Sequence, residues 1–259
     1  MQHSTSYILL FAAAVCAVCS VFVSGAAVLL EDRQLANIAL DKQKKVLVVA
    51  GLMEEGESIS RDEVAQRFDA NIVPEIVDLQ SGAVLESIDA DEFDQRKAAK
   101  DPEQSRPAPT NSAKVQRVPN NGQVFRVVQD GRLQAVIVPV SGMGLWSTLY
   151  GYIALGADMR TIVGITFYEH GETPGLGGEV DNPRWKALWK GRLAFDASGR
   201  PAIDVKKGMA GPVESDPYNV DGLSGATITS RGVGNLVRFW LGQDGFGPYL
   251  DAQRAGGSS

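Results

Sequence analysis

A cluster of hydroxyl side chains near the C-terminal end of the chain stands where a turn passes into an apolar pattern of helical period. Residues 221–229, called the third segment below, read Asp-Gly-Leu-Ser-Gly-Ala-Thr-Ile-Thr. Ser224, Thr227 or Thr229 could each cap the helix that follows. The first turn of a helix also binds anions, because its N–H groups are unpaired and its dipole is positive there. The residue types therefore indicate either an ordinary helix cap or a phosphate site.

Two earlier segments are also rich in glycine and in side chains that can contact a ligand. The first segment, 141–147, reads Ser-Gly-Met-Gly-Leu-Trp-Ser, and the second, 169–179, reads Glu-His-Gly-Glu-Thr-Pro-Gly-Leu-Gly-Gly-Glu. Glycine lets the backbone approach a ligand closely, and Trp146 offers a flat apolar surface. An aromatic ligand that carries a phosphate would use all three segments. The alternative is three surface turns, with Trp146 in the core and His170 an ordinary loop histidine.

Composition excludes several other classes of function. The net charge of −6 and the lack of a Lys/Arg-rich run argue against a nucleic-acid partner. The two cysteines, Cys16 and Cys19, lie near the N-terminus, so a zinc or haem site of His and Cys is close to excluded farther along. A Ser-His-Asp hydrolase would have to use His170, and no Gly-x-Ser-x-Gly turn occurs. Neither a Rossmann glycine motif nor a P-loop is present.

An uncharged apolar stretch precedes all of these segments. Residues 7–30 are long enough to cross a bilayer as a helix, and we expect a retained transmembrane anchor. A cleaved signal peptide competes, but the apolar run is long and residues 1–6 contain no Lys or Arg. Cys16 and Cys19 are expected to be small packing residues of that helix. Basic residues after the anchor, counted by the positive-inside rule, would place the large domain in the cytoplasm.

Patterns after the anchor predict helices first and strands later. Residues 35–53 have the period of an amphipathic helix, and 60–63 form a capping box for a short helix that Pro74 ends. The stretch 89–109, rich in charge and proline, is expected to be a solvated loop. Further strands are expected at 76–79, 124–128, 133–140, 150–155, 162–168 and 203–205, the second and third joined by a turn through Asp130 and Gly131.

Helices are expected to follow these strands. Asn182 and Pro183 open a short helix through Trp189. The helix after the third segment carries its apolar face on Val233, Leu236, Val237, Trp240 and Leu241. The sequence therefore predicts an α+β fold with a largely antiparallel sheet flanked by helices and preceded by one N-terminal transmembrane helix.

Three motifs identify a family resemblance. Ser224-Gly225-Ala226-Thr227, the run Glu-Thr-Pro-Gly-Leu-Gly at 172–177 and Gly-Met-Gly-Leu-Trp at 142–146 resemble the FMN-binding domain family. Together with the single anchor and the chain length, they resemble in particular the C subunits of Na⁺-translocating NADH:quinone reductases. The resemblance implies domains as follows: a tail at 1–6, the anchor at 7–30, a helical and loop region at 31–123, the FMN-binding domain at 124–253 and a tail at 254–259.

The resemblance also implies a cofactor and partners. FMN would be joined covalently by a phosphoester to Thr227, installed from FAD by a separate flavin transferase. Electrons would pass through this flavin from NADH toward quinone within a six-subunit complex that exports Na⁺. The domain would face the periplasmic side of the bacterial inner membrane, which overrides the charge count. The resemblance implies no metal and no catalytic side chain, since redox chemistry belongs to the cofactor.

Site residues follow from the motifs that match. Ser224 and the backbone N–H groups of Gly225 and Ala226 are expected to donate to the phosphate, and Asp221 to hold the turn or be recognised by the transferase. Thr229 is the near alternative for attachment, or else helps to cap the helix. The expected isoalloxazine pocket consists of Glu172, Thr173, Leu176 and Gly177, with Leu145 and Trp146 as its apolar wall.

Two other functions remain open at this point. The homologous G subunit of the Rnf ferredoxin:NAD complex shares the flavin motifs and an anchor, although the long segment before Val124 favours the Na⁺ pump. A membrane-anchored binding or scaffolding module would use the hydroxyl cluster only as a helix cap.

Overall fold

The computed structural model describes residues 4–256, apart from the side chain of Asp32. The chain divides into two compact units, residues 1–42 and residues 43–259. Helix α1 (Thr5–Val49) begins in the first unit and ends in the second. Its part from Thr5 to Glu31 is long and apolar enough to cross a membrane, and none of its most apolar stretch is buried. Cys16 and Cys19 are exposed free thiols on this helix.

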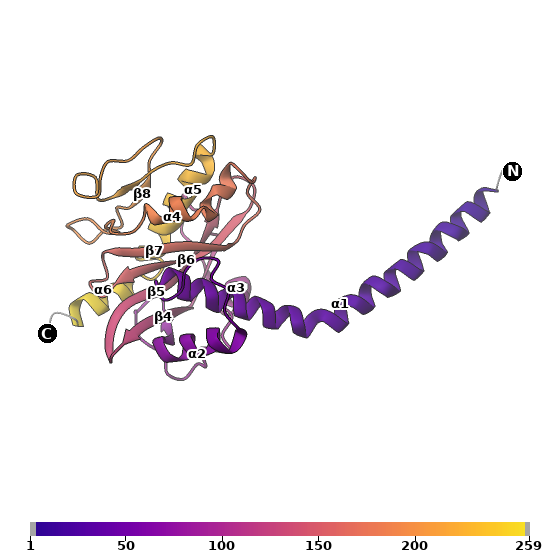
Figure 1. The fold of residues 1–259 in the computed structure, drawn as a ribbon, viewed down its shortest axis with the longest axis horizontal. Coiled ribbons are helices and arrows are strands. Elements are labelled where there is room, and N and C mark those ends of the chain that lie inside the picture. The colour runs from indigo at the N-terminus through magenta and orange to yellow at the C-terminus, as the bar shows by residue number, and fades with distance from the viewer. Residues whose placement is uncertain (1–3, 257–259) are drawn as a thin grey trace. The chain divides into compact units, whose positions relative to one another are not determined.

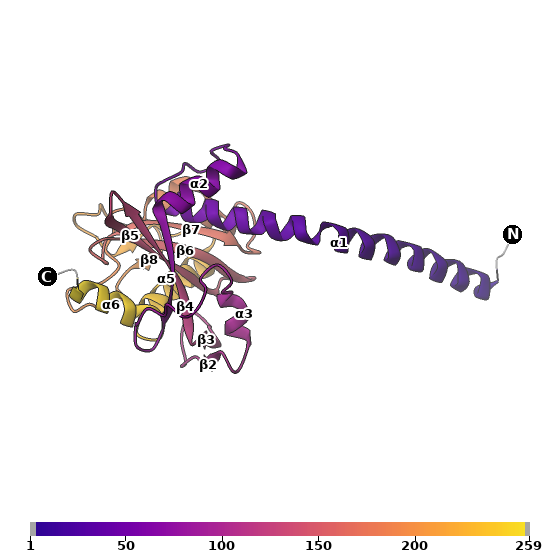
Figure 2. The same cartoon turned by 90° about the horizontal axis from the view of Figure 1, so that it is seen from below.

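The second unit contains all the remaining elements (Figures 1 and 2). In chain order these are α2 (Arg61–Asn71), β1 (Ile72–Asp78), α3 (Gln95–Lys100), β2 (Ser105–Pro107), β3 (Arg117–Pro119), β4 (Asn121–Gln129), β5 (Arg132–Met143), β6 (Thr148–Gly156), β7 (Ile162–Glu169), the 3₁₀ helix η1 (Gly177–Asp181), α4 (Pro183–Ala187), β8 (Asp204–Val205), β9 (Asn219–Val220), α5 (Thr227–Leu241) and α6 (Gly247–Gly256). The expected tails at 1–6 and 254–259 extend beyond the described residues.

A five-stranded antiparallel sheet in the order β1-β4-β5-β6-β7 forms the framework. The β4–β5 turn holds Asp130 and Gly131 at φ of 50° and 72°, the left-handed pair that a tight two-residue hairpin requires. The α+β class with a largely antiparallel sheet is therefore confirmed. The first segment comprises the last three residues of β5 and the β5–β6 connection, and the second segment begins in the last residue of β7.

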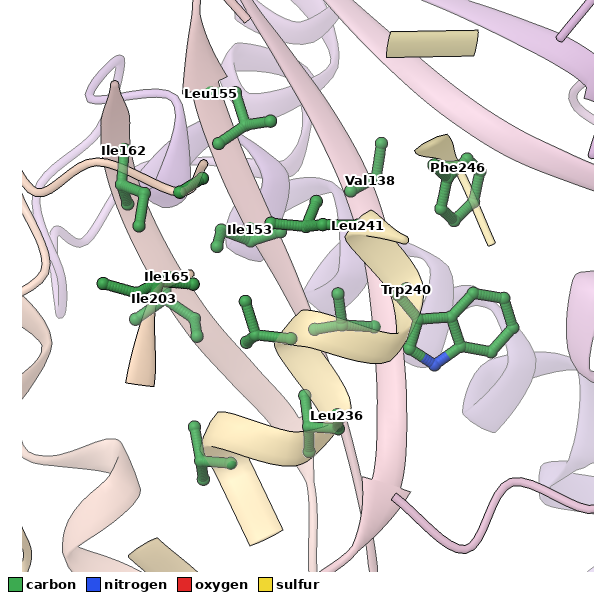
Figure 3. Close-up of a cluster of buried hydrophobic side chains, with 14 of the residues drawn as sticks. Val138, Ile153, Leu155, Ile162, Ile165, Ile203, Leu236, Trp240, Leu241 and Phe246 are labelled. Atoms are coloured by element: carbon green, nitrogen blue, oxygen red, sulfur yellow. The ribbon is translucent and has the colours of Figure 1, made fainter. Parts of the chain in front are cut away.

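Helix α5 covers one face of the sheet. Its residues Leu236, Trp240 and Leu241 pack over Val138 of β5 and Ile153 of β6 (Figure 3). All five apolar positions expected on the buried face of this helix are buried. Packing along the helix fixes its start at one end of the β5–β6 pair, next to the first segment.

The opposite face of the sheet is covered by the end of α1 and by α2. Val46 and Leu47 are buried there, and the ring of Phe68 on α2 packs edge-on against Phe125 of β4 at 6.2 Å between centroids. Ser60 caps α2 by accepting a hydrogen bond from Glu63 N at 3.2 Å, which confirms the expected start of this helix and the N-cap half of the capping box.

Three expectations about local structure need correction. Pro74 does not end α2: it lies within β1, where an edge strand tolerates a residue without an N–H group. The stretch 89–109 contains α3 and β2 because Asp94 caps α3, which then buries Ala98. The helix begun by Asn182 ends at Ala187. The expected last strand at 203–205 is present as β8 and pairs in parallel with β9, a partner that the local pattern did not predict.

Candidate functional site

The carboxylate of Glu172 joins the first two segments. Glu172 is only 5% exposed, and its Oε1 accepts hydrogen bonds from the backbone N–H groups of Leu145 at 3.1 Å, Trp146 at 2.9 Å and Ser147 at 3.3 Å. These three consecutive N–H groups line the bend between β5 and β6. A single buried carboxylate of the second segment thus fixes the backbone conformation of the first segment.

The third segment is attached to the same carboxylate. Thr229 in the first turn of α5 donates its hydroxyl to Glu172 Oε2 at 2.5 Å. Two glycines leave room for this arrangement, since a Cβ atom at Gly144 would lie 2.6 Å from Glu172 Oε1 and one at Gly177 would lie 2.6 Å from Oε2. The glycines at these positions therefore make space for a protein carboxylate.

Hydrogen bonding keeps Glu172 ionised. Burial is the largest single influence on its pKa and acts to raise it, but the hydrogen bonds from Thr229 and from the N–H groups of the first segment together outweigh burial. They lower the pKa of Glu172 below its ordinary value of 4.5. At neutral pH the three segments therefore meet around a negative charge.

The side chains of Thr227 and Thr229 lie in different environments. Thr229 is 1% exposed and its hydroxyl is used by Glu172, whereas Thr227 is exposed at the first position of α5. Two residues along a helix differ by roughly 200° in direction, so both hydroxyls cannot face the same side. Of the two, only Thr227 is open to a modifying enzyme.

The start of α5 has no side-chain cap, contrary to the expected capping by Ser224, Thr227 or Thr229. Ala226 occupies the N-cap position and no side-chain hydrogen bond to the helix start is formed. Ser230 Oγ instead accepts from Leu223 N at 2.9 Å. The first N–H groups of this 15-residue helix are consequently available to an external acceptor.

The turn before α5 is held by Asp221. Its Oδ1 accepts from Ala210 N at 2.8 Å, and its carbonyl oxygen accepts from Trp185 Nε1 at 2.8 Å. Asp221 therefore holds the turn, one of its two expected roles. Ala226 N donates to the Leu223 carbonyl at 3.1 Å, so this N–H group is engaged within the turn. Gly225 adopts φ of 70°, a left-handed conformation that suits glycine.

Large apolar side chains are exposed in the three segments that include Thr227. Trp146 is 68% exposed and Ile228 55%, and Leu145 and Leu176 are also exposed. A Cβ atom at Gly225 would lie 3.0 Å from Leu176 Cδ2, so the second segment lies against the third. Trp146 is thus not a core residue, and each of the three segments exposes at least one large apolar side chain.

Smaller contacts fix the second segment. Glu172 N donates to His170 Nδ1 at 3.2 Å, His170 Nε2 lies 2.8 Å from Asp181, and Ser147 Oγ accepts from Gly171 N at 2.6 Å. His170 therefore stabilises the loop, which agrees with its interpretation as an ordinary loop histidine. Thr173 holds the turn through its carbonyl, which accepts from Leu176 N at 3.1 Å, while its side chain is exposed. Sequence reasoning assigned no role to Ser147 or Asp181.

Of the expected site residues, Leu145, Trp146, Glu172, Leu176, Gly177 and Gly225 are brought together by direct contacts, and Ser224, Thr227 and Thr173 are exposed in the same three segments. Glu172 differs in kind from the others, because both its oxygens are occupied by protein groups. The burial of Thr229 could have been predicted from the sequence, because it lies four residues before Val233 and so shares the buried face of the helix.

Comparison with known proteins places this geometry in a family. The FMN-binding domain family matches residues 144–242, a range that includes the second and third segments and the last four residues of the first. The C subunit of the Na(+)-translocating NADH-quinone reductase from Pseudomonas aeruginosa is 50% identical over 258 residues, covering 98% of each chain. The corresponding C subunit from Vibrio anguillarum is 48% identical, covering 93% of this chain and 91% of the relative.

Solved structures agree in fold. The crystal structure of Shewanella oneidensis NqrC aligns with a TM-score of 0.78 and 38% identity, covering 85% of this chain and 99% of that one. The structure of the C subunit from Parabacteroides distasonis aligns with a TM-score of 0.67 and 30% identity, covering 85% and 96%. The chain therefore belongs to the family of Na(+)-translocating NADH-quinone reductase C subunits.

Proposed function

We propose that this chain is an electron-transfer subunit that carries FMN bound covalently through a phosphoester to Thr227. One observation carries the proposal: the exposed Thr227 hydroxyl stands at the uncapped start of α5, within the three segments that expose Leu145, Trp146, Leu176 and Ile228. Thr229, the near alternative, is buried and donates to Glu172. The names of its relatives support assembly into a Na⁺-translocating NADH-quinone reductase.

The residues present fit the phosphate of FMN. A phosphodiester on Thr227 lies at the positive end of α5, where a negative charge gains about 0.3–1 kcal/mol if exposed. The exposed Ser224 hydroxyl and the Gly225 N–H group are further donors in the turn. The free first-turn N–H groups would hold the anion without help from a basic side chain.

The residues present also fit an aromatic ring. Apolar surface for the ring is offered by Leu145, Trp146, Leu176 and Ile228. Bound FMN would cover part of this surface, and removing apolar surface from water is favourable. Glu172, Thr173 and Gly177 shape the second segment beneath it. Glu172 acts as a positioning residue, because its carboxylate is hydrogen-bonded to the first and third segments. Bound FMN supplies the electron-transfer chemistry, and the chain orients it and sets its surroundings.

Attachment needs a separate enzyme. A threonine hydroxyl is a weak nucleophile unless a base removes its proton. Among residues 4–256, no histidine or carboxylate is hydrogen-bonded to Thr227. We therefore infer that a flavin transferase joins the Thr227 oxygen to the FMN phosphorus of FAD, breaks the pyrophosphate bond so that AMP leaves, and supplies the base that takes the hydroxyl proton.

We further propose the domain limits and the location given by the family resemblance. The flavin domain spans 124–253, the region 31–123 links it to the anchor, and the soluble part faces the periplasm in a six-subunit complex of the inner membrane. The full-length relatives favour this assembly over the G subunit of an Rnf complex. Protease accessibility in spheroplasts tests the location, and full protection there would contradict it.

Expression of the full chain with and without a flavin transferase tests the attachment. We expect in-gel flavin fluorescence of the denatured protein and a mass increment of one FMN group on the peptide that contains Thr227. Thr227→Ala is expected to lose both signals, whereas Thr229→Ser, which keeps the hydroxyl that Glu172 needs, retains them. FMN on the Thr227→Ala protein would refute the assignment, and no flavin on the wild type would favour a scaffolding role.

A further inference from the structure

A cavity lies on the described part of the chain beside the first segment, whose residues 141–143 line one side of it, whereas Trp146 and Thr227 do not line it. It has a volume of about 520 Å³ and is bounded by α3, by β3 and the residues before it, by the end of β5 and by Trp240 of α5. Figure 2 shows α3 beside β2 and β3. This volume lies within the range of about 300–1,000 Å³ that is typical of small-molecule sites.

The charge of the cavity is positive. Arg96, Lys100, Lys114 and Arg117 line it, and no Asp or Glu does, although the whole chain carries a net charge of −6. Arg96 is neutralised by Glu169 at 2.6 Å. Within residues 4–256, neither lysine nor Arg117 forms an ion pair. Three uncompensated positive charges therefore surround one cavity.

The two arginines are held rigidly. The Arg96 guanidinium lies 3.8 Å from the centroid of the Tyr150 ring and bonds both oxygens of Glu169. Arg117 donates from Nε to Ser105 Oγ at 2.8 Å and from Nη2 to the Ser105 carbonyl at 2.6 Å. These contacts fix the positions of both guanidinium groups at the wall of the cavity.

The loop that carries Lys114 is shaped to present it. Lys114 has φ of 56°, a left-handed conformation that a lysine rarely adopts. The Asn111 side chain holds the loop by accepting from Val115 N at 3.0 Å and donating to the Val115 carbonyl at 2.8 Å. Such strain is typical of sites where the position of one side chain matters.

The rest of the lining is apolar or aromatic. Val115, Met143, Tyr150 and Trp240 contribute to it, and Trp240 is oriented by donating from Nε1 to the Ser141 carbonyl at 2.6 Å. A site with cations at its edge and apolar walls suits a ligand with an anionic head and an apolar body. We propose that this cavity binds an amphiphilic organic anion, with Lys100 and Lys114 as its charge-recognising residues.

Calorimetric titration of the full chain in neutral detergent tests this site, whether or not flavin is attached. The probe is naphthalenesulfonate, and naphthalenemethanol is its neutral counterpart. We expect saturable binding of the sulfonate that the Lys100→Gln/Lys114→Gln double variant weakens by about tenfold. Lys97→Gln, on the same helix but 87% exposed outside the cavity, should change the affinity by less than about twofold.

Two further arms define the ligand. Ala99→Phe narrows the cavity without changing charge and is expected to weaken the sulfonate. Displacement by dihexanoylphosphatidylglycerol would assign a phospholipid source, and lack of displacement a soluble organic anion; either result supports the site. No saturable binding, equal binding of the neutral alcohol or of inorganic phosphate, or an equal loss in Lys97→Gln would overturn the proposal.

Discussion

Replacing Glu172 by glutamine tests whether a buried charge organises the candidate site. Glutamine keeps the size of the side chain and one acceptor oxygen, but it removes the negative charge. It also places an amide NH₂ group where one carboxylate oxygen now accepts from Thr229. The threonine hydroxyl can turn to accept from that NH₂ group, so the shape of the site survives while its bonds weaken.

The expected cost follows from the bonds involved. Two of them are short: Trp146 N to Oε1 at 2.9 Å and Thr229 Oγ1 to Oε2 at 2.5 Å. A hydrogen bond to a charged group contributes about 1.5–3 kcal/mol and a neutral one about 0.5–1.5 kcal/mol. Losing about 1 kcal/mol for each short bond gives a decrease of about 2 kcal/mol in the free energy of unfolding at neutral pH.

The pH dependence of this difference has a definite sign. The pKa of Glu172 is lowered in the folded protein, so the carboxylate contributes stability above its ordinary value of 4.5. That contribution is lost as the pH falls below 4.5 and through the lower folded pKa. The difference between wild type and Glu172→Gln should therefore be full at about pH 7 and shrink steadily below about pH 4.

Urea unfolding of the full chain in neutral detergent, followed by circular dichroism from about pH 7 to about pH 3, measures this difference. Glu179→Gln is the matched control, because the side chain of this glutamate in the same segment accepts from Asn182 Nδ2, three residues away, at 2.7 Å. It should cost less than about 1 kcal/mol. A Glu172→Gln effect that stays constant over the whole pH range would refute the reasoning from charge.

The remaining predictions concern space, exposure and an ion pair whose cation is buried. Gly144→Ala should lower the free energy of unfolding by about 1–3 kcal/mol, because its Cβ atom would meet the Glu172 carboxylate. Gly175→Ala meets nothing within 4 Å but has φ of 76°, so it should cost only about 1 kcal/mol. Urea unfolding midpoints compare the two variants. Trp146→Ala should leave stability within about 0.5 kcal/mol yet make the attached flavin more accessible to iodide quenching, and unchanged quenching would argue against the proposed apolar wall. Lys186 is buried and paired with Glu55, so Glu55→Gln should destabilise more than Lys186→Met, since only the former leaves a buried cation unpaired; thermal midpoints in the reverse order would contradict this.

Local chemistry determined much of the framework. The turn through Asp130 and Gly131 needs only its own two residues to adopt left-handed backbone, and Ser60 needs only Glu63 three residues on to cap α2. The helical period of α5 likewise follows from neighbouring residues. Such features are predictable because the interacting groups lie a few residues apart.

The role of Glu172 could not be predicted in this way. Its partners in the first segment lie 25 to 27 residues away, and Thr229 lies 57 residues away. No local spacing indicates which backbone N–H groups a carboxylate will meet after the sheet forms. The same is true of α3, whose Arg96 meets Glu169 across 73 residues.

The sequence alone determined the apolar N-terminal helix, the antiparallel α+β class and the three segments with their family motifs, because these depend on residue types, period and order. Only the tertiary structure decided that Trp146 is exposed and that Thr229 is buried while Thr227 is exposed. It also decided that the Glu172 carboxylate accepts its hydrogen bonds from protein groups. The physical reason is that α5 must bury one face against β5 and β6, and this packing selects which hydroxyl meets the carboxylate and which meets solvent.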